Sequence, residues 1–579
     1  MNIRRRLLAL SAALMAGSAL GAPAAPRPNI VLIIADDWGY SDPGSFGSEQ
    51  QTPNLDAVAR SGVRLANFHV AASCSPTRAM LLTGVDNHRA GLGNMPETIP
   101  PAHRGRPGYD AVLNNRVITL GDRFRAGGWR TIYIGKWHLG HAPHGLPAQR
   151  GFDHSLALTQ SGADNFANKP NLLLYDRADW WQDDRPARLP ARFFSSDLLV
   201  DQAVRQVDAA RGQPFFLTLG LLANHIPVQA PDADIAAQAG RYAGGWGELR
   251  AARAVGTARA GLLPAVPMVT MRDSPDWSTL PADERARRTR AMQAYAAMTA
   301  ATDRALGRLI SHLKARGLWD NTIFVFVSDN GPEGLDPLRS RFQRFNTELN
   351  YDTAIDQQGR PGSFTAVGPA WASALAAPLR GYKFSGWEGG LRVPMFIAGP
   401  GVPRGGIARD FAHATDLAPT LLALAGLPAT TRAGALPIEG RDLSPLLAGR
   451  PVRGKDEAVG YELSGNAALF MGHWKLVKNL PPYGDGRWHL FDIMADPGET
   501  DDRASAEPAR FADMQARYAR WAADHGVLAM PPGYAAPDQI QSNALRDLLP
   551  KRLAPLVGAL IVLMAGVLTG RRWKPRRRA

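Results

Sequence analysis

Two pairs of oxygen-bearing residues stand directly behind runs of apolar residues: Asp36 with Asp37, and Asp329 with Asn330. Carboxylate and amide oxygens, with no cysteine or clustered histidines among them, favour a hard cation such as Ca²⁺ or Mg²⁺ over Zn²⁺. Each pair alone could instead cap a helix or form a turn after a strand. Because both pairs follow the same kind of run, the sequence favours one shared metal site.

Two further apolar runs lead into basic residues. Lys136 and His138 follow one run within Gly-Lys-Trp-His, and His225 follows another within Asn-His-Ile-Pro. An ammonium group and imidazoles gathered near a cation could bind an oxyanion and move protons. A surface lysine and a core histidine are the alternatives for Lys136 and His138. Their position between glycines directly after a predicted strand favours function.

Cys74 is the only cysteine in the chain, and a helix is expected to begin there. Pro76 is tolerated in a first helical turn, and Gly84 can end the helix. Cys74 would then lie at a helix N-terminus, where free backbone N–H groups favour a negative group. Arg78, one turn later, would direct a bidentate oxyanion donor to the same place. A buried cysteine that packs as a small apolar side chain is the alternative.

These polar endings belong to a repeating pattern of strands and helices. Continuous β-branched apolar runs are typical of strands buried on both faces of a parallel sheet. The runs are Asn29–Ala35, Thr131–Ile134, Pro214–Leu219, Thr322–Ser328 and Val393–Ala398. Apolar residues at three- and four-residue spacing predict helices over Leu55–Gly62, Ala203–Arg211 and Ala291–Arg316. We therefore predict a doubly wound α/β sheet with its ligand site beyond the carboxyl ends of the strands.

The two ends of the chain carry most of its positive charge. The formal net charge is +14 at pH 7. Eleven basic residues lie in terminal segments that hold no acidic residue: Arg4, Arg5, Arg6, Lys551, Arg552, Arg571, Arg572, Lys574, Arg576, Arg577 and Arg578. Without them the formal charge is +3, so the basic composition indicates no nucleic-acid partner.

Both ends have the composition of targeting segments. Arginines, an apolar run and small residues predict a secretory signal peptide over residues 1–24. Residues 553–570 are uncharged and apolar and precede the basic tail 571–579, which predicts a transmembrane anchor with a cytoplasmic tail. A buried core helix or a sorting signal that is later removed is the alternative. We expect a protein of the bacterial cell envelope, exported to the periplasm and anchored in the inner membrane.

Several motifs occur together and in order. The central one is Cys74-Ser75-Pro76-Thr77-Arg78 followed by Leu81-Leu82-Thr83-Gly84, and others cover residues 35–37, 52–56, 135–140, 328–331, 387–394, 488–492 and 496–500. From about Pro28 to Asp502 the chain thereby resembles the type I, formylglycine-dependent sulfatases of the alkaline phosphatase superfamily, above all bacterial arylsulfatases. The resemblance implies a large mixed, mostly parallel sheet flanked by helices, with a smaller C-terminal antiparallel-sheet subdomain.

The resemblance also implies a cofactor and a modification. In that family a formylglycine-generating enzyme oxidises the motif cysteine, which here is Cys74, to formylglycine (3-oxoalanine). A hydrated aldehyde offers one hydroxyl to attack sulfur and a second whose deprotonation expels sulfate, whereas a thiolate would leave a sulfo-enzyme that water must displace. One Ca²⁺ per chain would be held by Asp36, Asp37, Cys74, Asp329 and Asn330.

The remaining roles are likewise those of the matching family positions. Asp329 would act as the base for the nucleophile, and Arg78 would stabilise the oxyanion. Lys136 and Lys383 would hold the sulfate group, while Lys383 and His225 assist the departing alcohol or phenol. His138 would be the base that releases sulfate, and Ser161 would contact the sulfate group. The substrate would be a sulfate ester, with aryl sulfates as the default.

The expected organisation divides the chain into six parts. They are the signal peptide 1–24, a catalytic α/β domain 27–450, a small sheet-plus-helix subdomain 455–530, a linker 531–552, the anchor 553–570 and the tail 571–579. Residues 231–282 and 337–377 are insertions expected to rim the pocket. Two other functions stay open: a phosphate or phosphonate ester hydrolase of the same superfamily, and a catalytically silent, membrane-tethered metal-binding homologue.

Overall fold

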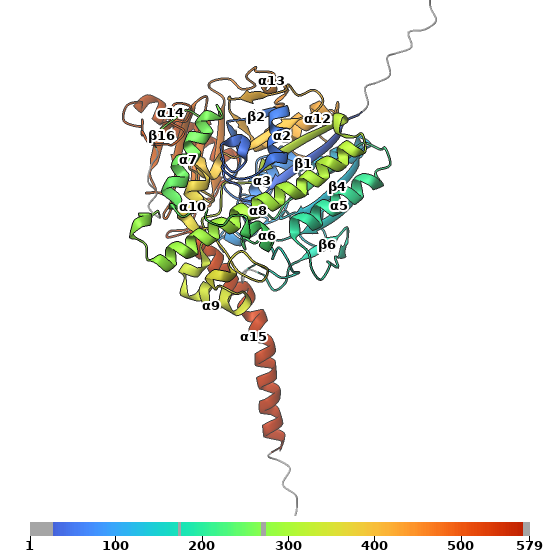
Figure 1. Ribbon diagram of the computed structural model, residues 1–579, viewed down its shortest axis with the longest axis vertical. Coiled ribbons are helices and arrows are strands. Elements are labelled where there is room, and N and C mark those ends of the chain that lie inside the picture. Colours follow the sequence, from blue (N-terminus) through green and yellow to red (C-terminus); the bar gives the residue numbers. More distant parts are fainter. Residues whose placement is uncertain (1–26, 172–174, 268–273, 571–579) are drawn as a thin grey trace, which may run out of the picture.

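The computed structural model describes residues 27–171, 175–267 and 274–570. The predicted signal peptide, residues 1–24, and the basic tail, residues 571–579, lie outside the described residues. The centre of the molecule is a mixed sheet with helices on both faces (Figure 1). The strands lie in the order β11 (Gly406–Ala408), β2 (Val63–Leu65), β10 (Met395–Ala398), β9 (Thr322–Ser328), β1 (Asn29–Ala35), β8 (Phe215–Gly220), β4 (Arg130–Lys136), β5 (His154–Leu158), β6 (Trp180–Gln182) and β7 (Arg185–Pro186).

The five central strands β9, β1, β8, β4 and β5 run parallel to one another. Ala35 of β1 pairs with Ser328 of β9, and Ile34 pairs with Gly220 of β8. The carboxyl ends of these strands therefore meet at one edge of the sheet. The expected large mixed, mostly parallel sheet is confirmed.

Alternate residues of β1 enter two separate cores. Ile30 and Leu32 pack with helices α3 (Cys74–Thr83), α4 (Leu120–Ala126) and α12 (Leu417–Leu424). Val31 and Ile33 pack with α2 (Pro53–Ser61), α5 (Ser195–Ala209) and α8 (Ala282–Ala315). Because successive strand residues point to opposite faces, an unbroken apolar run is what a sheet covered on both sides requires.

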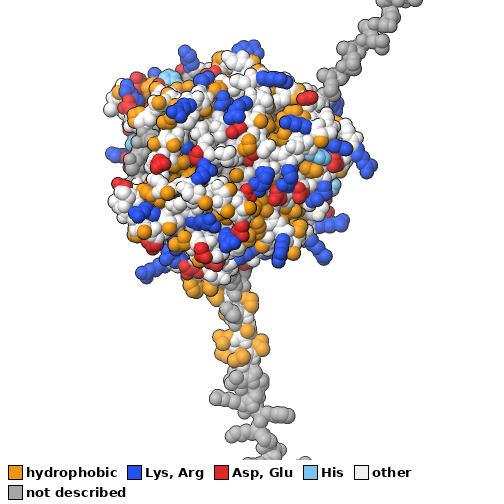
Figure 2. All heavy atoms as spheres, in the orientation of Figure 1, with side chains coloured by type: hydrophobic (Ala, Val, Ile, Leu, Met, Phe, Trp, Pro, Cys, Tyr) orange, Lys and Arg blue, Asp and Glu red, His pale blue; other side chains and the backbone are white. Residues whose placement is uncertain are grey.

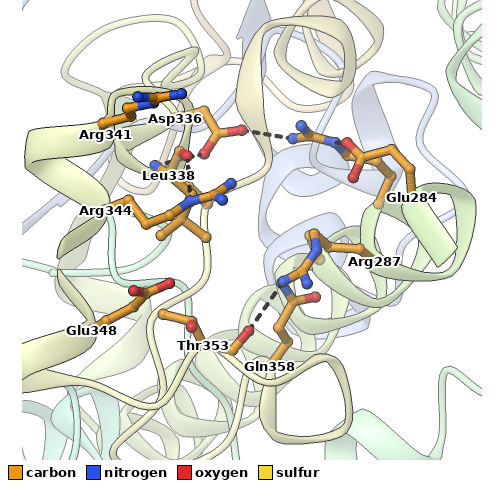
Figure 3. A pocket seen from close by; sticks show the side chains of 12 residues that line it. Glu284, Arg287, Asp336, Leu338, Arg341, Arg344, Glu348, Thr353 and Gln358 are labelled. Carbon is orange, nitrogen blue, oxygen red and sulfur yellow. Dashed lines mark hydrogen bonds and ion pairs between the residues drawn. The ribbon is translucent and has the colours of Figure 1, made fainter.

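Helices of the two predicted insertions pack around α8. They are α6 (Asp232–Ala236), α7 (Gly245–Arg259), α9 (Arg341–Asn350) and α10 (Gly368–Leu375). A cavity of about 280 Å³ lies between α8 and α9. Its lining includes Arg287, Arg341 and Arg344 together with Glu284, Asp336 and Glu348 (Figure 3). Arg288 ion-pairs with Glu284 and Asp336 at its edge.

A second, antiparallel sheet follows the large one, as expected. Its strands are β13 (Ala458–Leu463), β14 (Asn466–Met471), β15 (Trp474–Lys478) and β16 (Trp488–Asp492), and α14 (Pro508–Asp524) packs on it. The short α11 (Glu388–Leu391) and α13 (Ser444–Leu447) lie in the chain before this sheet. The buried Lys475 of β15 connects the small sheet with α11, because its ammonium group lies 2.9 Å from Glu388 of that helix and 2.8 Å from Glu499.

The C-terminal helix α15 (Ala536–Gly570) contains the residues that were predicted to form a membrane anchor. It projects from the body, and apolar side chains on it such as Leu560 and Val562 are exposed (Figures 1 and 2). Among the described residues, no helix is long and apolar enough to cross a membrane. The predicted inner-membrane anchor over residues 553–570, and the localisation built on it, are therefore wrong.

Candidate active site

The two predicted pairs of metal ligands lie side by side at the carboxyl edge of the sheet. Asp36 and Asp37 follow β1, and Asp329 and Asn330 follow the neighbouring β9. All four side chains are buried. The backbone N–H of Asp37 lies 3.4 Å from Asp329 Oδ1, and Asn330 Nδ2 donates to Asp37 Oδ1 over 2.6 Å. Asp37 has a φ of 62°, an uncommon backbone conformation for a residue other than glycine, and such residues cluster at functional sites.

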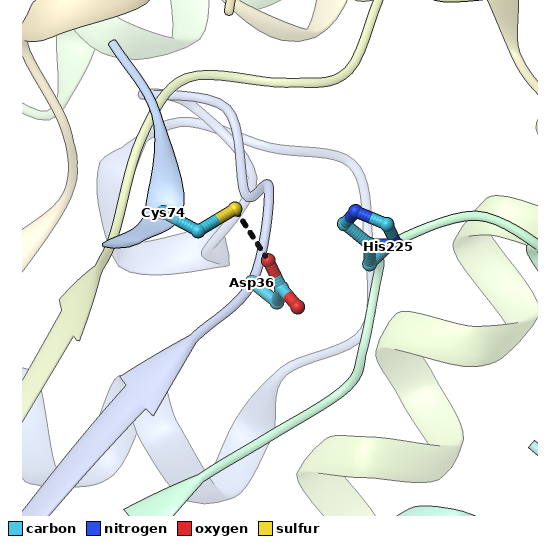
Figure 4. Close-up of side chains that lie close together, drawn as sticks. All are labelled: Asp36, Cys74 and His225. Carbon is cyan, nitrogen blue, oxygen red and sulfur yellow. Dashed lines mark hydrogen bonds between the residues drawn. The ribbon is translucent and has the colours of Figure 1, made fainter. Parts of the chain in front are cut away.

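Cys74 is the first residue of α3 and is completely buried. Its Sγ lies 3.6 Å from Asp36 Oδ1, and the two side chains point toward one another, with His225 nearby (Figure 4). Burial, together with the neighbouring Asp329, raises the pKa of the thiol well above its usual value. The predicted helix start is confirmed, and Gly84 ends the helix in the left-handed conformation. The fold therefore places the cysteine of α3 against the carboxylates at the strand ends.

Ligand atoms of Asp36, Asp37, Cys74 and Asp329 all lie within 4.8 Å of one another. These residues fit a hard divalent cation. Asp37 Oδ2 and Asn330 Oδ1 are buried acceptors without a hydrogen-bond partner, and leaving such atoms unpaired costs about 1–3 kcal/mol each. A cation among them would satisfy these atoms, and oxygen donors are what Ca²⁺ prefers.

Lys136 reaches the cluster from the end of β4. Its ammonium group donates to both carboxylate oxygens of Asp36, over 2.9 and 2.7 Å. Burial lowers the pKa of Lys136, but Asp36 outweighs that effect and the net pKa is raised, so the group is cationic. The preceding Gly135 has a φ of 104°, and a Cβ there would lie 1.8 Å from Gly220 O of β8. Only glycine allows this close approach of the two strands next to the site.

Lys383 reaches the same cluster at Asp37 rather than Asp36. Its ammonium group lies 2.7 Å from Asp37 Oδ1 and 3.1 Å from Glu333 Oε2. Burial opposes the charged form, but these carboxylates raise the pKa of Lys383 well above its usual value. Glu333 was not among the predicted site residues, although it follows Asp329 by four residues and enters the site on the same loop.

His225 lies beside Asp37, with Nε2 3.9 Å from Asp37 Oδ2. Its Nδ1 lies 2.8 Å from the carbonyl oxygen of Ile226, which can only accept, so the proton of the neutral ring is on Nδ1. Burial and the nearby Lys136 hold the pKa of His225 well below its usual value. At neutral pH the ring therefore directs an unprotonated Nε2 toward the cluster.

Arg78 is completely buried and binds Asp329. Its Nε donates to Asp329 Oδ2 over 2.8 Å, and Nη2 lies 2.7 Å from the same oxygen. Nη1 donates to the carbonyl oxygen of Lys136 over 2.7 Å. The guanidinium group thus connects α3 with the ends of β9 and β4 and leaves Asp329 Oδ1 facing the cluster.

His138 and Ser161 belong to a second group of side chains beside the cluster. His138 Nε2 lies 3.2 and 3.3 Å from the two oxygens of Glu97, and Tyr175 donates its hydroxyl proton to the same carboxylate. The hydrogen bonds of Ser161 go to Tyr175 rather than to the carboxylate cluster. Glu97 and Tyr175 were missed by sequence reasoning, because no pattern links them to residues so distant along the chain.

Comparison of the chain with known protein families and structures also indicates a sulfatase. The family model described as Sulfatase matches residues 28–427. The chain is 35% identical over 454 residues to an arylsulfatase of Klebsiella aerogenes, which covers 76% of this chain and 96% of the relative. It is also 35% identical over 539 residues to an uncharacterized sulfatase of Schizosaccharomyces pombe, with 88% of this chain and 96% of the relative covered.

A solved structure shares the fold. The crystal structure of Ps i-CgsB in complex with k-i-k-neocarrahexaose matches 90% of this chain and 98% of its own, with a TM-score of 0.63 and 25% identity. The family match covers the large sheet, the cysteine helix and the carboxylate cluster. The chain therefore belongs to the type I sulfatases of the alkaline phosphatase superfamily, enzymes that hydrolyse sulfate esters.

Proposed function

We propose that the protein hydrolyses aryl sulfates at the carboxylate cluster, with a formylglycine made from Cys74 and one Ca²⁺ held by Asp36, Asp37, Asp329 and Asn330. The observation that carries the proposal is the position of Cys74. Its sulfur lies 3.6 Å from Asp36 Oδ1 at the start of a helix, inside a cluster of oxygen ligands. When bound, the ion would polarise a sulfate oxygen and the hydrated aldehyde would supply the hydroxyl that attacks sulfur.

The sulfate group would be held by Lys136 and Lys383, the two buried ammonium groups that contact the carboxylate cluster. Each is paired with one carboxylate of the Asp36-Asp37 pair. Since a bound divalent cation would take over the charge balance of these carboxylates, both ammonium groups would become available to an oxyanion. The free backbone N–H groups at the start of α3 would favour negative charge at the same place.

The proton for the departing alcohol would come from Lys383. His225 presents an unprotonated Nε2 in its neutral state, because Ile226 O binds the proton on Nδ1. Lys383 carries protons that a leaving oxygen can take, and His225 Nε2 can accept a hydrogen bond that orients the groups. Ser161 would contact the substrate from the Tyr175 side.

Asp329 would take the proton of the attacking hydroxyl. Arg78 occupies Asp329 Oδ2 and leaves Oδ1 for this task, and its positive charge would also stabilise the oxyanion. His138 would be the base that releases sulfate at the end of the cycle. The 35% sequence identity with the Klebsiella arylsulfatase supports a phenol as the leaving group of the substrate.

Two measurements test this proposal. Mass spectrometry of the peptide that contains Cys74, from protein made in its active host, should show an aldehyde in place of the thiol. Rates on the sulfate and phosphate esters of one phenol should favour the sulfate by several orders of magnitude, and Cys74→Ala should abolish both. An unmodified thiol would support a silent metal-binding homologue, and faster phosphate cleavage would support a phosphate ester hydrolase.

A further inference from the structure

We propose that Glu97 is a positioning residue for His138: its carboxylate holds the imidazole proton on Nε2 and leaves Nδ1 as the basic nitrogen. This inference rests on the proposed function, in which His138 is the base that releases sulfate. It names the atom that accepts the proton and the residue that selects it. Glu97 touches neither substrate nor nucleophile and acts through the histidine.

The contact between the two side chains determines the tautomer. His138 Nε2 lies 3.2 Å from Glu97 Oε1 and 3.3 Å from Oε2. An ionised carboxylate can only accept hydrogen bonds, so Nε2 must carry the proton. Burial raises the pKa of Glu97, but His138 and Tyr175 hold it at about 2, so the carboxylate is ionised.

The other ring nitrogen is free to act. His138 is 3% exposed, and its Nδ1 is buried without a hydrogen-bond partner. A buried acceptor without a hydrogen bond lowers the stability of the folded protein, and a catalytic role is one reason for such an atom to persist. His138 also has a φ of 54°, so the backbone is held in an uncommon conformation at this residue. The arrangement points to Nδ1 as the nitrogen that removes a proton.

The charged groups around the imidazole of His138 favour its neutral form before the reaction. Burial and the cationic Lys136 and Arg78 lower the pKa of His138, whereas Glu97 raises it, and the net pKa lies below the usual value. In the release step, Nδ1 would take the proton of the second hydroxyl, the one that did not attack sulfur, and an imidazolium would form. The electron pair of that O–H bond would form the C=O bond of the aldehyde, and the bond from the same carbon to the sulfate oxygen would break as sulfate leaves. The carboxylate of Glu97 would stabilise that positive charge at hydrogen-bond distance.

Glu97 is itself held in place from two sides. The hydroxyl of Tyr175 donates to its carboxylate. Its backbone belongs to the short helix η2 (Pro96–Thr98), on which α15 packs: Asn543 Nδ2 donates to Glu97 O over 2.9 Å and to Ile99 O over 3.0 Å. Tyr534 donates to Thr98 O over 2.9 Å. Residues in and just before the C-terminal helix therefore hold the backbone of the segment that carries Glu97.

The first experiment observes the tautomer without using activity. The full chain is labelled with ¹⁵N-histidine, and the ring nitrogens of His138 are assigned by comparison with His138→Gln. We expect a protonated Nε2 and an unprotonated Nδ1 at neutral pH, and a loss of this preference in Glu97→Gln, whose amide can also donate. A protonated Nδ1 in the wild type, or an unchanged tautomer in Glu97→Gln, would overturn the proposal.

The second experiment separates sulfate release from the earlier steps. In a stopped-flow assay with an aryl sulfate, Glu97→Gln should keep the first rapid release of one phenol per enzyme and lose about 100-fold in the steady-state rate. Glu97→Asp should recover part of that rate, since it keeps an acceptor carboxylate. Tyr175→Phe, which leaves both members of the pair intact, should lose less, and the exposed Glu348→Gln should match the wild type.

The outcomes distinguish this inference from the proposed function. If the wild type releases no phenol, the proposed function fails, while the tautomer measurement still decides the role of Glu97. If Glu97→Gln slows the first turnover and the steady state equally, or Glu97→Asp recovers nothing, Glu97 does not act through the release base. If Glu97→Gln does not fold, the first-turnover and steady-state rates of Glu97→Asp and Tyr175→Phe are compared with those of the wild type instead.

Discussion

Asp36 and Asp329 lie next to each other because each directly follows one member of a paired position, Ala35 of β1 and Ser328 of β9. The parallel ladder thus sets two carboxylates, 293 positions apart in the chain, at one edge of the sheet. Both are completely buried, and each is paired with a cation, Lys136 or Arg78. Like charges this close require such compensation.

Removal of the divalent ion should lower both activity and stability. Treatment with EGTA should abolish sulfate ester hydrolysis and lower Tm by several degrees, because an ion at 100 times its Kd stabilises the native state by about 2.7 kcal/mol. Added Ca²⁺ should restore both. In Asn330→Ala, the Ca²⁺-dependent rise in Tm should be smaller. A Tm that EGTA leaves unchanged in the wild type would contradict a bound ion at this cluster.

Glu333→Gln should affect poor leaving groups more than good ones. The substitution removes one of the two carboxylates that hold the ammonium group of Lys383, which we expect to protonate the departing oxygen. Proton donation matters most for a basic alkoxide and least for a nitrophenolate. We expect kcat/KM for an alkyl sulfate to fall about ten times more than for nitrophenyl sulfate. Equal losses on both substrates would assign Glu333 a purely structural role.

Gly162→Ala should disturb the position of His225. A Cβ at residue 162 would lie 2.8 Å from His225 Nδ1 and 2.7 Å from Asn171 Nδ2, closer than side-chain atoms tolerate. The ring would have to shift and lose its hydrogen bond to Ile226 O, so kcat should fall about tenfold or more. Gly247→Ala, where the added Cβ meets open space, is the matched control. Steady-state kinetics and thermal melting of both variants decide the point.

Lys475→Met should destabilise the protein because two buried glutamates lose the ammonium group that neutralises them. The substitution leaves Glu388 and Glu499 buried and close together without their shared ammonium group. Breaking a buried ion pair by removal of one partner costs about 3–5 kcal/mol. Denaturant unfolding should show this loss, while the exposed Lys455→Met should unfold as the wild type does. A loss below 1 kcal/mol would show that the two carboxylates take up protons at little cost.

Stability should decline as the pH rises from neutral to mildly alkaline, because of His88. Burial lowers the pKa of this histidine, but Asp86 and Glu462 outweigh burial and raise it to about 9. The unfolded histidine titrates near 6.5, so the stabilisation is complete below that pH and is lost as the pH rises to about 9. It amounts to at most roughly 3 kcal/mol. Unfolding of wild type and His88→Gln between pH 6 and 10 should show a steeper decline in the wild type.

Strand ends and the cysteine helix could be predicted from the sequence because the information is local. An unbroken apolar run identifies a strand covered on both faces, and parallel neighbours bring their carboxyl ends to one edge. Asp36 and Asp329 were therefore expected to meet, and Cys74 was expected at the start of its helix. The large mixed sheet and the smaller antiparallel sheet were expected from the same runs and from the resemblance of the motifs.

Tertiary structure decided which partner each charged group takes. The pairing of Arg78 with Asp329, of Lys383 with Glu333 and of His138 with Glu97 depends on loops and helices that meet only after folding. The same distinction explains the error at the C-terminus. Composition alone indicated a membrane anchor, whereas no described helix is long and apolar enough to cross a membrane. Periodicity is a property of neighbouring residues, but a hydrogen bond between residues 97 and 138 depends on the packing of the whole chain.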